Sequence, residues 1–335
     1  MIVDESILQP DIENIDIPGL SDCGVTLQVM RLDRVHPLAG GNKIYKLHGW
    51  LQKARRSGRT CLLSIGGAHS NHLHALALSA ARAGLRSAAL VRFDANQPLT
   101  PTLQQLSDTG MRLEFIDAQT FRRRYETHFA APWLARYERA LWIPEGGSGP
   151  PGLTGPKALM QALNRHGRAA DVLAVAAGSG GFAAGLLQGC ENGQEIAAFA
   201  MPRDPQLESR IRTLAGGGGG KLRFFPAEDG RFGYFDAGLL QFAQRWHSQT
   251  GVLPDPVYTT RLFRRAIEHI RAGGWQGKRV CLVHSGGLQG WAGMSGKLSA
   301  LGGQSALDWL HAAMAAEAAV GGAEFAAALP PLSRR

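Results

Sequence analysis

Two lysines three positions apart are the residues whose chemistry stands out first in this sequence. Lys43 and Lys46 follow Gly41-Asn42 at what reads as the entrance to a helix. A lysine amine can form an imine with an aldehyde cofactor when burial or a nearby positive charge lowers its pKa. Lys46 could supply that charge or bind a phosphate. Taken alone, the segment is also compatible with two solvated lysines.

A second polar segment lies where an apolar run gives way to a helix. Ser70 and Asn71 follow a Gly-Gly pair, and their side chains could bind a ligand or cap the N-terminus of that helix. Three histidines lie close by, at His69, His72 and His74. Because no carboxylate or cysteine near them in sequence completes a metal site, we predict no bound metal.

The third candidate is a glycine-rich turn between an apolar run and a stretch of small residues. It reads Gly178-Ser179-Gly180-Gly181-Phe182-Ala183-Ala184. Glycines let backbone amides converge on an anion, and a helix N-terminus adds partial positive charge for a phosphate. The same letters fit a permissive G-x-G-x-x-A dinucleotide fingerprint, with Asp204 at the acidic position. A nicotinamide dehydrogenase therefore stays open as an alternative function.

Two further side chains could act on a proton or on a ring nitrogen. Tyr258, three residues after Asp255, could donate a proton, and Ser285, directly after His284, could bond the nitrogen of an aromatic ring. Each segment is also ordinary as a turn or a strand end, so only the combination of all these segments is informative.

Three apolar runs, each followed by glycines and a helical stretch, must position these side chains. The runs are Cys61 to Ile65, Val172 to Ala177 and Val280 to Val283. Repeated strand-turn-helix units predict an α/β fold of open, mostly parallel sheets flanked by helices. Ligands of such sheets collect at the carboxyl ends of the strands, where these turns lie. The three turns are therefore predicted to share one pocket.

Periodicity and turn residues predict several further elements. Helices are expected over 46–57, 71–83 and 312–328, and a strand over 88–92. Residues 144–152 should cross between two lobes, and the run Gly216 to Gly220 should form a flexible surface loop. The chain end at 330–335 should be frayed.

The formal charge of +9 would suit a nucleic-acid-binding protein, but the distribution of the charge does not. The basic residues are scattered, with tight runs at 55–56, 122–124 and 334–335. We interpret the first two runs as solvated helix faces and the last as a frayed end, and we predict no nucleic-acid partner. Small anionic substrates suit this charge better.

Length and composition indicate a globular protein with two lobes or one large α/β unit. The chain has 335 residues, 44% of them hydrophobic, and 43 are glycine. No run approaches the roughly 18 to 20 apolar residues that span a bilayer, and the acidic start lacks the features of a signal peptide. We expect a cytoplasmic protein with no membrane partner, whose four separated cysteines are free thiols.

Six motifs that occur in one order resemble the 1-aminocyclopropane-1-carboxylate (ACC) deaminase and D-cysteine desulfhydrase family. They are Gly41-Asn42-Lys43-x-x-Lys46-Leu47, Gly66-Gly67-x-x-Ser70-Asn71-His72, Pro144-Glu145-Gly146-Gly147-Ser148, Gly178-Ser179-Gly180-Gly181, Asp255-Pro256-Val257-Tyr258 and His284-Ser285-Gly286-Gly287. Each motif alone is common, but the ordered set is specific, and it runs from about Arg31 to Gly290.

This resemblance implies the two-lobed, tryptophan-synthase-β-like fold of pyridoxal-phosphate enzymes. Residues 1–47 and 159–335 would form the large cofactor-binding lobe, and residues 48–158 the small inserted lobe. The implied cofactor is pyridoxal 5′-phosphate, the implied substrate is a small amino acid, and the implied assembly is a homodimer.

The resemblance also assigns roles to individual positions. Catalytic roles fall to Lys43, Ser70 and Tyr258, with Lys43 as the lysine that links to the cofactor aldehyde. Cofactor contacts fall to Lys43, Lys46, Asn71, Gly178, Ser179, Gly180, Gly181, Phe182, Thr259 and Ser285. Lys46 and the glycine turn would hold the phosphate, and Asn71 would bond the 3′-oxygen. Ser285 or Thr259 would approach the pyridine nitrogen.

Several departures from the family pattern bear on affinity and substrate. Phe182 replaces the usual threonine of the phosphate turn, which removes a hydrogen bond of about 1–3 kcal/mol to a charged group. Ser285 also replaces a threonine, and Thr260-Arg261 replaces a Gly-Lys pair. Thr259 stands where the deaminase branch tends to carry glutamate, which favours desulfhydrase-like chemistry.

The resulting prediction is β-elimination from D-cysteine. Lys43 would remove the α-proton, and loss of the thiol would lead to pyruvate, ammonia and sulfide. Besides the nicotinamide dehydrogenase, two alternatives remain. One is ACC deamination, for which Ser70 or Tyr258 would have to help open the ring, and the other is a non-catalytic pyridoxal-phosphate-binding protein.

Overall fold

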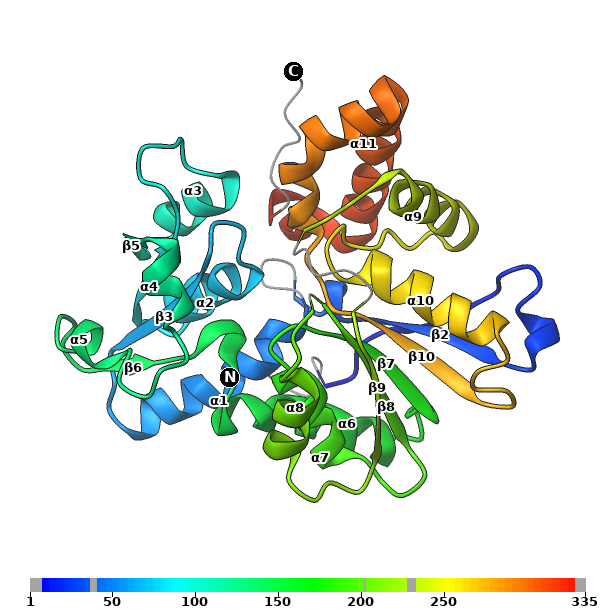
Figure 1. Cartoon of the computed structure of the whole chain (residues 1–335), viewed down its shortest axis with the longest axis horizontal. Coiled ribbons are helices and arrows are strands. Elements are labelled where there is room, and N and C mark those ends of the chain that lie inside the picture. The colour runs from blue at the N-terminus through cyan, green and yellow to red at the C-terminus, as the bar shows by residue number, and fades with distance from the viewer. Residues whose placement is uncertain (1–7, 37–40, 202, 228–232, 329–335) are drawn as a thin grey trace.

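The structure, a computed structural model, describes residues 8–36, 41–201, 203–227 and 233–328. Its strands form two open sheets flanked by helices (Figure 1). Strand pairing is parallel in both sheets except between the first two strands, which pair antiparallel. The predicted α/β class with open, mostly parallel sheets is therefore confirmed.

The larger sheet takes its strands from both ends of the chain. Their order is β1 (Ile12–Ile15), β2 (Thr26–Arg31), β10 (Arg279–His284), β7 (Val172–Ala177), β8 (Glu195–Ala200) and β9 (Lys221–Phe225). The central strands β10, β7 and β8 are almost wholly buried. Parallel strands with helices on both faces have this burial, which is why their sequences are nearly continuous apolar runs.

The smaller sheet takes its strands from the middle of the chain. Their order is β5 (Arg112–Ile116), β4 (Arg86–Arg92), β3 (Cys61–Gly67) and β6 (Ala140–Trp142). Figure 1 shows this sheet beside the larger one, each with its own helices. The lobe limits at 47/48 and 158/159 stay a prediction.

Helices cover the faces of both sheets. They are α1 (Asn42–Arg56), α2 (Asn71–Arg82), α3 (Pro101–Asp108), α4 (Ala118–Arg122), α5 (Ala131–Leu134), α6 (Thr154–Arg165), α7 (Gly181–Gly189), α8 (Leu207–Ala215), α9 (Ala237–Thr250), α10 (Thr259–Arg271) and α11 (Ser295–Ala328). On the larger sheet, α6 and α7 pack on one face around Leu163 and Val175, and α9 and α10 pack on the other around Trp246 and Phe263. α1 packs against both α6 and α2, so it connects the helices of the two sheets.

Short 3₁₀ turns complete the secondary structure. They are η1 (Ser21–Cys23), η2 (Leu32–Arg34), η3 (Glu145–Gly147), η4 (Pro150–Leu153) and η5 (Leu288–Met294). η3 and η4 carry the chain from β6 of the smaller sheet to α6 of the larger one, which is the crossing predicted over 144–152. Within the described ranges, no helix is both long and apolar enough to cross a bilayer.

Most predicted elements are confirmed within two residues, but the start of the first long helix needs correction. α1 begins at Asn42 and not at Lys46, because a distant segment holds its N-terminus. The glycine run 216–220 forms a surface loop between α8 and β9, as predicted, with Gly216, Gly217 and Gly219 exposed, and its flexibility stays a prediction. Gly218 and Gly220 pack so closely on Leu187 and Cys190 that a Cβ at either glycine would collide with them. The predicted helix over 312–328 is the second half of α11, and 330–335 lies outside the described residues.

A buried ionic cluster connects α11 to the edge of the larger sheet. Arg31, at the end of β2, bonds Asp33 at 2.7 Å and Glu317 of α11 at 2.9 Å, and all three side chains are 1% exposed. Glu317 also accepts hydrogen bonds from Arg34 and from the Leu253 N–H. Several donors for each carboxylate are what buried charges require.

Candidate active site

Segments that follow β3, β7 and β10 come together near the N-terminus of α1. Lys46 of α1 donates to Ser179 in the turn after β7, and Gln289 after β10 donates to Asn71 at the start of α2. Both bonds join segments that are far apart in sequence. The carboxyl ends of strands from the two sheets therefore contribute to one site, as is usual for open parallel sheets.

α1 starts at this site because the turn after β10 holds its N-terminus. Gly41 adopts a φ of +107°, and a Cβ there would collide with the Ser285 carbonyl oxygen. The same oxygen accepts a hydrogen bond from the Asn42 N–H at 3.2 Å. Glycine at position 41 thus lets α1 begin close to the turn after β10. Lys43 is therefore in the first turn of a helix that starts at this site.

Lys43 is half-buried in the first turn of α1, and its Nζ donates to Asn42 Oδ1 at 2.6 Å. Burial lowers the pKa of Lys43 to about 8, although the Asp255 carboxylate acts in the opposite direction. Roughly a tenth of such an amine is unprotonated at pH 7, far more than for a solvated lysine. This amine is suited to condense with an aldehyde or to accept a proton.

Lys46, one helical turn further on, is fully enclosed. It is 2% exposed, and its Nζ donates to Ser179 Oγ at 3.0 Å and to Ser148 Oγ at 3.2 Å. Burial lowers the pKa of Lys46 well below its usual value, and Lys43 adds to this effect. In the part of the chain that the structure describes, no carboxylate forms an ion pair with Lys46. A buried cation held by hydroxyls alone lacks a counter-ion.

The space beside the Lys46 ammonium has the properties of a phosphate site. A Cβ at Gly181 would lie 3.3 Å from Lys46 Nζ and 2.9 Å from Ser148 Oγ, so the glycine leaves this position open. Gly181 is also the first residue of α7, whose N-terminal N–H groups carry partial positive charge. A phosphate dianion would supply the missing counter-ion. The residues present therefore fit the phosphate of pyridoxal phosphate, and Ser148 is a site residue to which sequence reasoning gave no role.

Phe182 contributes no side-chain atom to this phosphate site. Its ring is buried in the core of the larger sheet, with its centroid 6.3 Å from that of Tyr45. Only its backbone N–H, in the first turn of α7, is available to an anion. The expected contact of Phe182 with the cofactor is thus limited to the backbone.

The N-terminus of α2 presents Ser70 and Asn71 to the same region. Ser70 Oγ caps the helix by accepting a hydrogen bond from the Leu73 N–H at 3.2 Å, so the capping interpretation is confirmed. Asn71 Oδ1 accepts a hydrogen bond from Gln289 Nε2 at 2.9 Å. Asn71 Nδ2 lies 2.7 Å from the point where a Cβ at Gly287 would be. The Asn71 amide therefore lies where the segment after β3 of the smaller sheet meets the segment after β10 of the larger sheet.

His72 is a buried histidine for which sequence reasoning found no role. Its Nε2 lies 2.9 Å from Ser64 Oγ, and because Ser64 donates its only proton to the Ile143 carbonyl at 2.8 Å, Nε2 must be the donor. Its Nδ1 is then a buried acceptor, and it has no partner among the described residues. Burial and the two nearby lysines lower the pKa of His72, so the ring stays neutral and adds no charge to the site.

Asp255 is a second buried residue to which the sequence analysis gave no role. Its carboxylate accepts hydrogen bonds from the N–H groups of Val257, Tyr258 and Thr259 at 2.8–2.9 Å and from the Thr259 hydroxyl at 2.6 Å. The same hydroxyl accepts a hydrogen bond from the Asp255 N–H, so it is occupied on both sides. Of the two candidates for the pyridine nitrogen, Ser285 is the one whose hydroxyl has no partner within the described ranges.

Tyr258 lies between Asp255 and the glycine turn after β7. A Cβ at Gly178 would lie 3.9 Å from the Tyr258 hydroxyl oxygen. Burial raises the pKa of Tyr258, and the carboxylates of Asp255 and Glu145 raise it further. The phenol therefore keeps its proton near neutral pH, which suits a proton donor and not a base.

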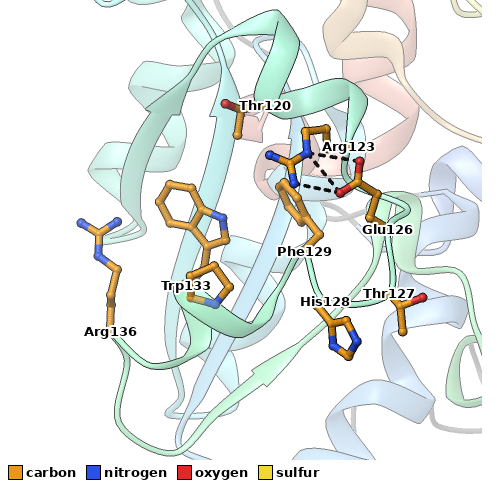
Figure 2. A pocket seen from close by; sticks show the side chains of 9 residues that line it. Thr120, Arg123, Glu126, Thr127, His128, Phe129, Trp133 and Arg136 are labelled. Atoms are coloured by element: carbon orange, nitrogen blue, oxygen red, sulfur yellow. Dashed lines mark hydrogen bonds and ion pairs between the residues drawn. The ribbon is translucent and has the colours of Figure 1, made fainter.

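A separate depression of about 810 Å³ lies on the side of the smaller sheet, and none of the predicted site residues lines it (Figure 2). Its lining residues are Thr120, Arg123, Glu126, Thr127, His128, Phe129, Pro132, Trp133 and Arg136. Figure 2 shows Arg123 paired with Glu126, and Arg136 pairs with Glu114 at 2.7 Å. Because these charges already have partners, the depression offers less chemistry than the lysine site.

Arg124, next to this depression, corrects one expectation about the basic run 122–124. Its Nε donates to Glu145 at 2.6 Å, and its guanidinium lies over the rings of Phe121 and Tyr125. Only the first two arginines of the run are exposed to solvent. Arg124 is instead a structural link between α4 and the segment that carries Ser148.

Comparison with known proteins agrees with the fold and with the chemistry of the lysine site. Residues 13–286 match the family described as pyridoxal-phosphate dependent enzymes. The chain is 29% identical over 306 residues to D-cysteine desulfhydrase of Salmonella choleraesuis, covering 81% of this chain and 90% of the relative. It is 25% identical over 318 residues to the mitochondrial bifunctional D-cysteine desulfhydrase/1-aminocyclopropane-1-carboxylate deaminase of Arabidopsis thaliana, covering 84% and 77%.

A solved structure gives the same fold. The crystal structure of an ACC deaminase homologue covers 90% of this chain and 94% of its own, with a TM-score of 0.75 and 24% sequence identity. The chain belongs to the family of pyridoxal-phosphate dependent enzymes. The recognised family, the two-sheet fold and the cofactor class are thereby confirmed, whereas the roles of single site residues stay predictions.

Proposed function

We propose that this protein catalyses β-elimination from D-cysteine, which with one water gives pyruvate, ammonia and sulfide. The observation that carries the proposal is Thr259. Its hydroxyl is buried and held by Asp255 at the position where the ACC deaminase branch tends to have a glutamate. The name of the Salmonella relative supports the same reaction.

Bound pyridoxal phosphate would supply the electron-withdrawing ring that makes the α-proton of an amino acid removable. Lys46, Ser148, Ser179 and the N–H groups of the glycine turn would hold its phosphate. Asn71 Nδ2 would donate to the 3′-oxygen, and the Ser285 hydroxyl would face the pyridine nitrogen. The two lobes would therefore hold the cofactor from both sides.

Lys43 would move the proton in the proposed reaction. Its Nζ would take the α-proton, a task for which a pKa of about 8 suits it better than the usual 10.5. Tyr258 could donate a proton to the leaving thiolate, since burial raises its pKa and keeps the phenol protonated. Asp255 would stay out of proton transfer, because four hydrogen bonds already occupy its oxygens.

The two candidate substrates differ in what they demand of residue 259. D-cysteine has an α-hydrogen that one base, Lys43, can remove. The α-carbon of ACC carries no hydrogen, so ring opening needs a nucleophile or a proton transfer at another carbon. A threonine whose hydroxyl is fully bonded offers no ionisable group for this second task. Elimination from D-cysteine needs fewer groups and is the reaction that we favour.

ACC deamination stays the alternative reaction, and the bifunctional name of the Arabidopsis relative supports it. A non-catalytic pyridoxal-phosphate-binding protein is the alternative of another class, supported by the loss of a hydroxyl at Phe182. The homodimer and the cytoplasmic location are further proposals that rest on the resemblance and on the sequence. Light scattering of the purified protein tests the first of them.

The cofactor assignment is tested first by visible absorbance of the purified protein, before and after borohydride, followed by peptide mass mapping. We expect a yellow protein whose cofactor becomes permanently attached to Lys43 on reduction. Lys43→Arg keeps the positive charge and should bind the cofactor without a borohydride-stable link. No visible band after addition of pyridoxal phosphate would contradict the proposal.

The substrate assignment is tested with D-cysteine, L-cysteine and ACC in parallel. We expect sulfide, ammonia and pyruvate from D-cysteine and no 2-oxobutyrate from ACC. The matched variant is Thr259→Glu, which places a carboxylate where the deaminase branch has one. Turnover of ACC and not of D-cysteine by the natural protein would establish the alternative, and a yellow protein that turns over no amino acid would favour the non-catalytic role.

A further inference from the structure

The amide of Asn71 is held from the opposite lobe by a residue that no family motif includes. Gln289 lies in η5, after the last strand of the larger sheet, whereas Asn71 starts α2, after β3 of the smaller sheet. Gln289 Nε2 donates to Asn71 Oδ1 at 2.9 Å across this contact. Both side chains are partly buried, which protects the bond from competition with water.

The direction of this bond determines what the rest of the amide can do. An asparagine side chain has one acceptor oxygen and one donor nitrogen. Because Gln289 donates to the oxygen, the nitrogen is the atom that remains for a ligand. Asn71 Nδ2 lies 2.7 Å from where a Cβ at Gly287 would be, and Gly287 has a φ of +100°. The backbone at Gly287 thus leaves room on the donor side of the amide.

We propose that Gln289 is a positioning residue that keeps the Asn71 Nδ2 donor turned toward the 3′-oxygen of the cofactor. The inference rests on the proposed function, because that function assigns the 3′-oxygen to Asn71. Without Gln289 the amide would rotate, and its oxygen would face the cofactor in part of the molecules. An N–H donor stabilises the deprotonated 3′-oxygen, which the visible absorption band of the lysine-linked cofactor requires.

The inference predicts a spectroscopic change without any substrate. Gln289→Met keeps an unbranched side chain of similar length but cannot donate to Asn71. We expect the ratio of visible to near-ultraviolet absorbance to fall about two- to tenfold. The free-energy cost of ordering one side chain on binding corresponds to a factor of this size in an equilibrium constant. The dissociation constant of pyridoxal phosphate should rise by a similar factor. The melting temperature of the cofactor-free protein should change little.

A double-mutant cycle shows whether Gln289 acts through Asn71. In an Asn71→Ala background, Gln289→Met should change neither the absorbance ratio nor the affinity any further. The matched control is Gln304→Met, which removes a similar bond of 2.8 Å to Asp308 on the exposed surface of α11 and should leave the spectrum unchanged.

Each other result would overturn the inference. An unchanged ratio in Gln289→Met would mean that Asn71 needs no positioning, and an equal loss in both backgrounds would mean that Gln289 acts elsewhere. A lower melting temperature with an unchanged ratio would indicate a structural role alone. The absorbance ratio and the cofactor affinity are measured on the cofactor-bound protein without substrate. An incorrect assignment of the amino acid substrate would therefore not affect them. A natural protein with no visible band would overturn this inference and the cofactor assignment together.

Discussion

Replacing Lys46 by methionine should have opposite effects on the cofactor-free and the cofactor-loaded protein. In the cofactor-free protein, the Lys46 amine is enclosed and held by two hydroxyls, and burial disfavours its charged form and so lowers its pKa well below the usual value. Methionine has a similar length and no charge, so it can fill the same space without the cost of desolvation. Exchange of buried charged groups for apolar ones is often neutral or gains about 1–4 kcal/mol, so we expect the melting temperature to rise by a few degrees.

The loaded protein should instead lose affinity for its cofactor. The Lys46 ammonium is proposed to bond the phosphate, and a hydrogen bond to a charged group contributes about 1.5–3 kcal/mol. Since about 1.4 kcal/mol corresponds to a tenfold change in dissociation constant, the affinity should fall roughly 10- to 100-fold. The stabilisation by added pyridoxal phosphate should shrink accordingly.

Thermal unfolding with and without pyridoxal phosphate, together with absorbance titration of the cofactor, measures both effects. Lys53→Met is the control, because Lys53 is an exposed lysine on the same helix and should affect neither quantity. The reasoning is refuted if the cofactor-free Lys46→Met protein melts below the natural protein, since Lys46 would then stabilise the fold. Unchanged cofactor affinity would refute the assignment of the phosphate site.

Three further predictions test the same physical picture. Between about pH 8 and 10.5 the unfolded chain binds more protons at Lys43 than the folded chain does, so the free energy of unfolding of the cofactor-free protein should rise with pH. The rise should be less steep in Lys43→Met, and urea unfolding at several pH values measures it. Glu317→Gln should lower the free energy of unfolding by about 3 kcal/mol, because its carboxylate is the buried partner of two arginines, whereas exposed Glu268→Gln should have little effect in the same assay. Ser148→Ala should raise the dissociation constant of pyridoxal phosphate about 2- to 10-fold in an absorbance titration, because it removes a hydroxyl that would hold the phosphate, whereas exposed Ser209→Ala should not raise it.

The sheets could be predicted from local patterns, but the start of α1 could not. β7 spans Val172–Ala177, the predicted run, because an uninterrupted apolar segment bounded by glycine is typical of a parallel strand buried on both faces. The start of α1 at Asn42 has no capping side chain. It depends on the carbonyl oxygen of Ser285, which lies near the other end of the chain, and no local pattern reports such a contact.

The candidate site divides in the same way between local and distant information. Asp255 closes a turn on Thr259 four residues later, so a local capping pattern could have identified it. Ser148 is joined to Lys46 by a bond between residues 102 positions apart, and its own segment carries no signal of that partner. The type of an ionisable side chain can be read from a sequence, but its pKa depends on burial and on such distant partners. This is why two lysines one helical turn apart differ in the folded protein: Lys43 is a half-buried amine near Asp255, and Lys46 is an enclosed amine whose charged form has no anion beside it among the described residues.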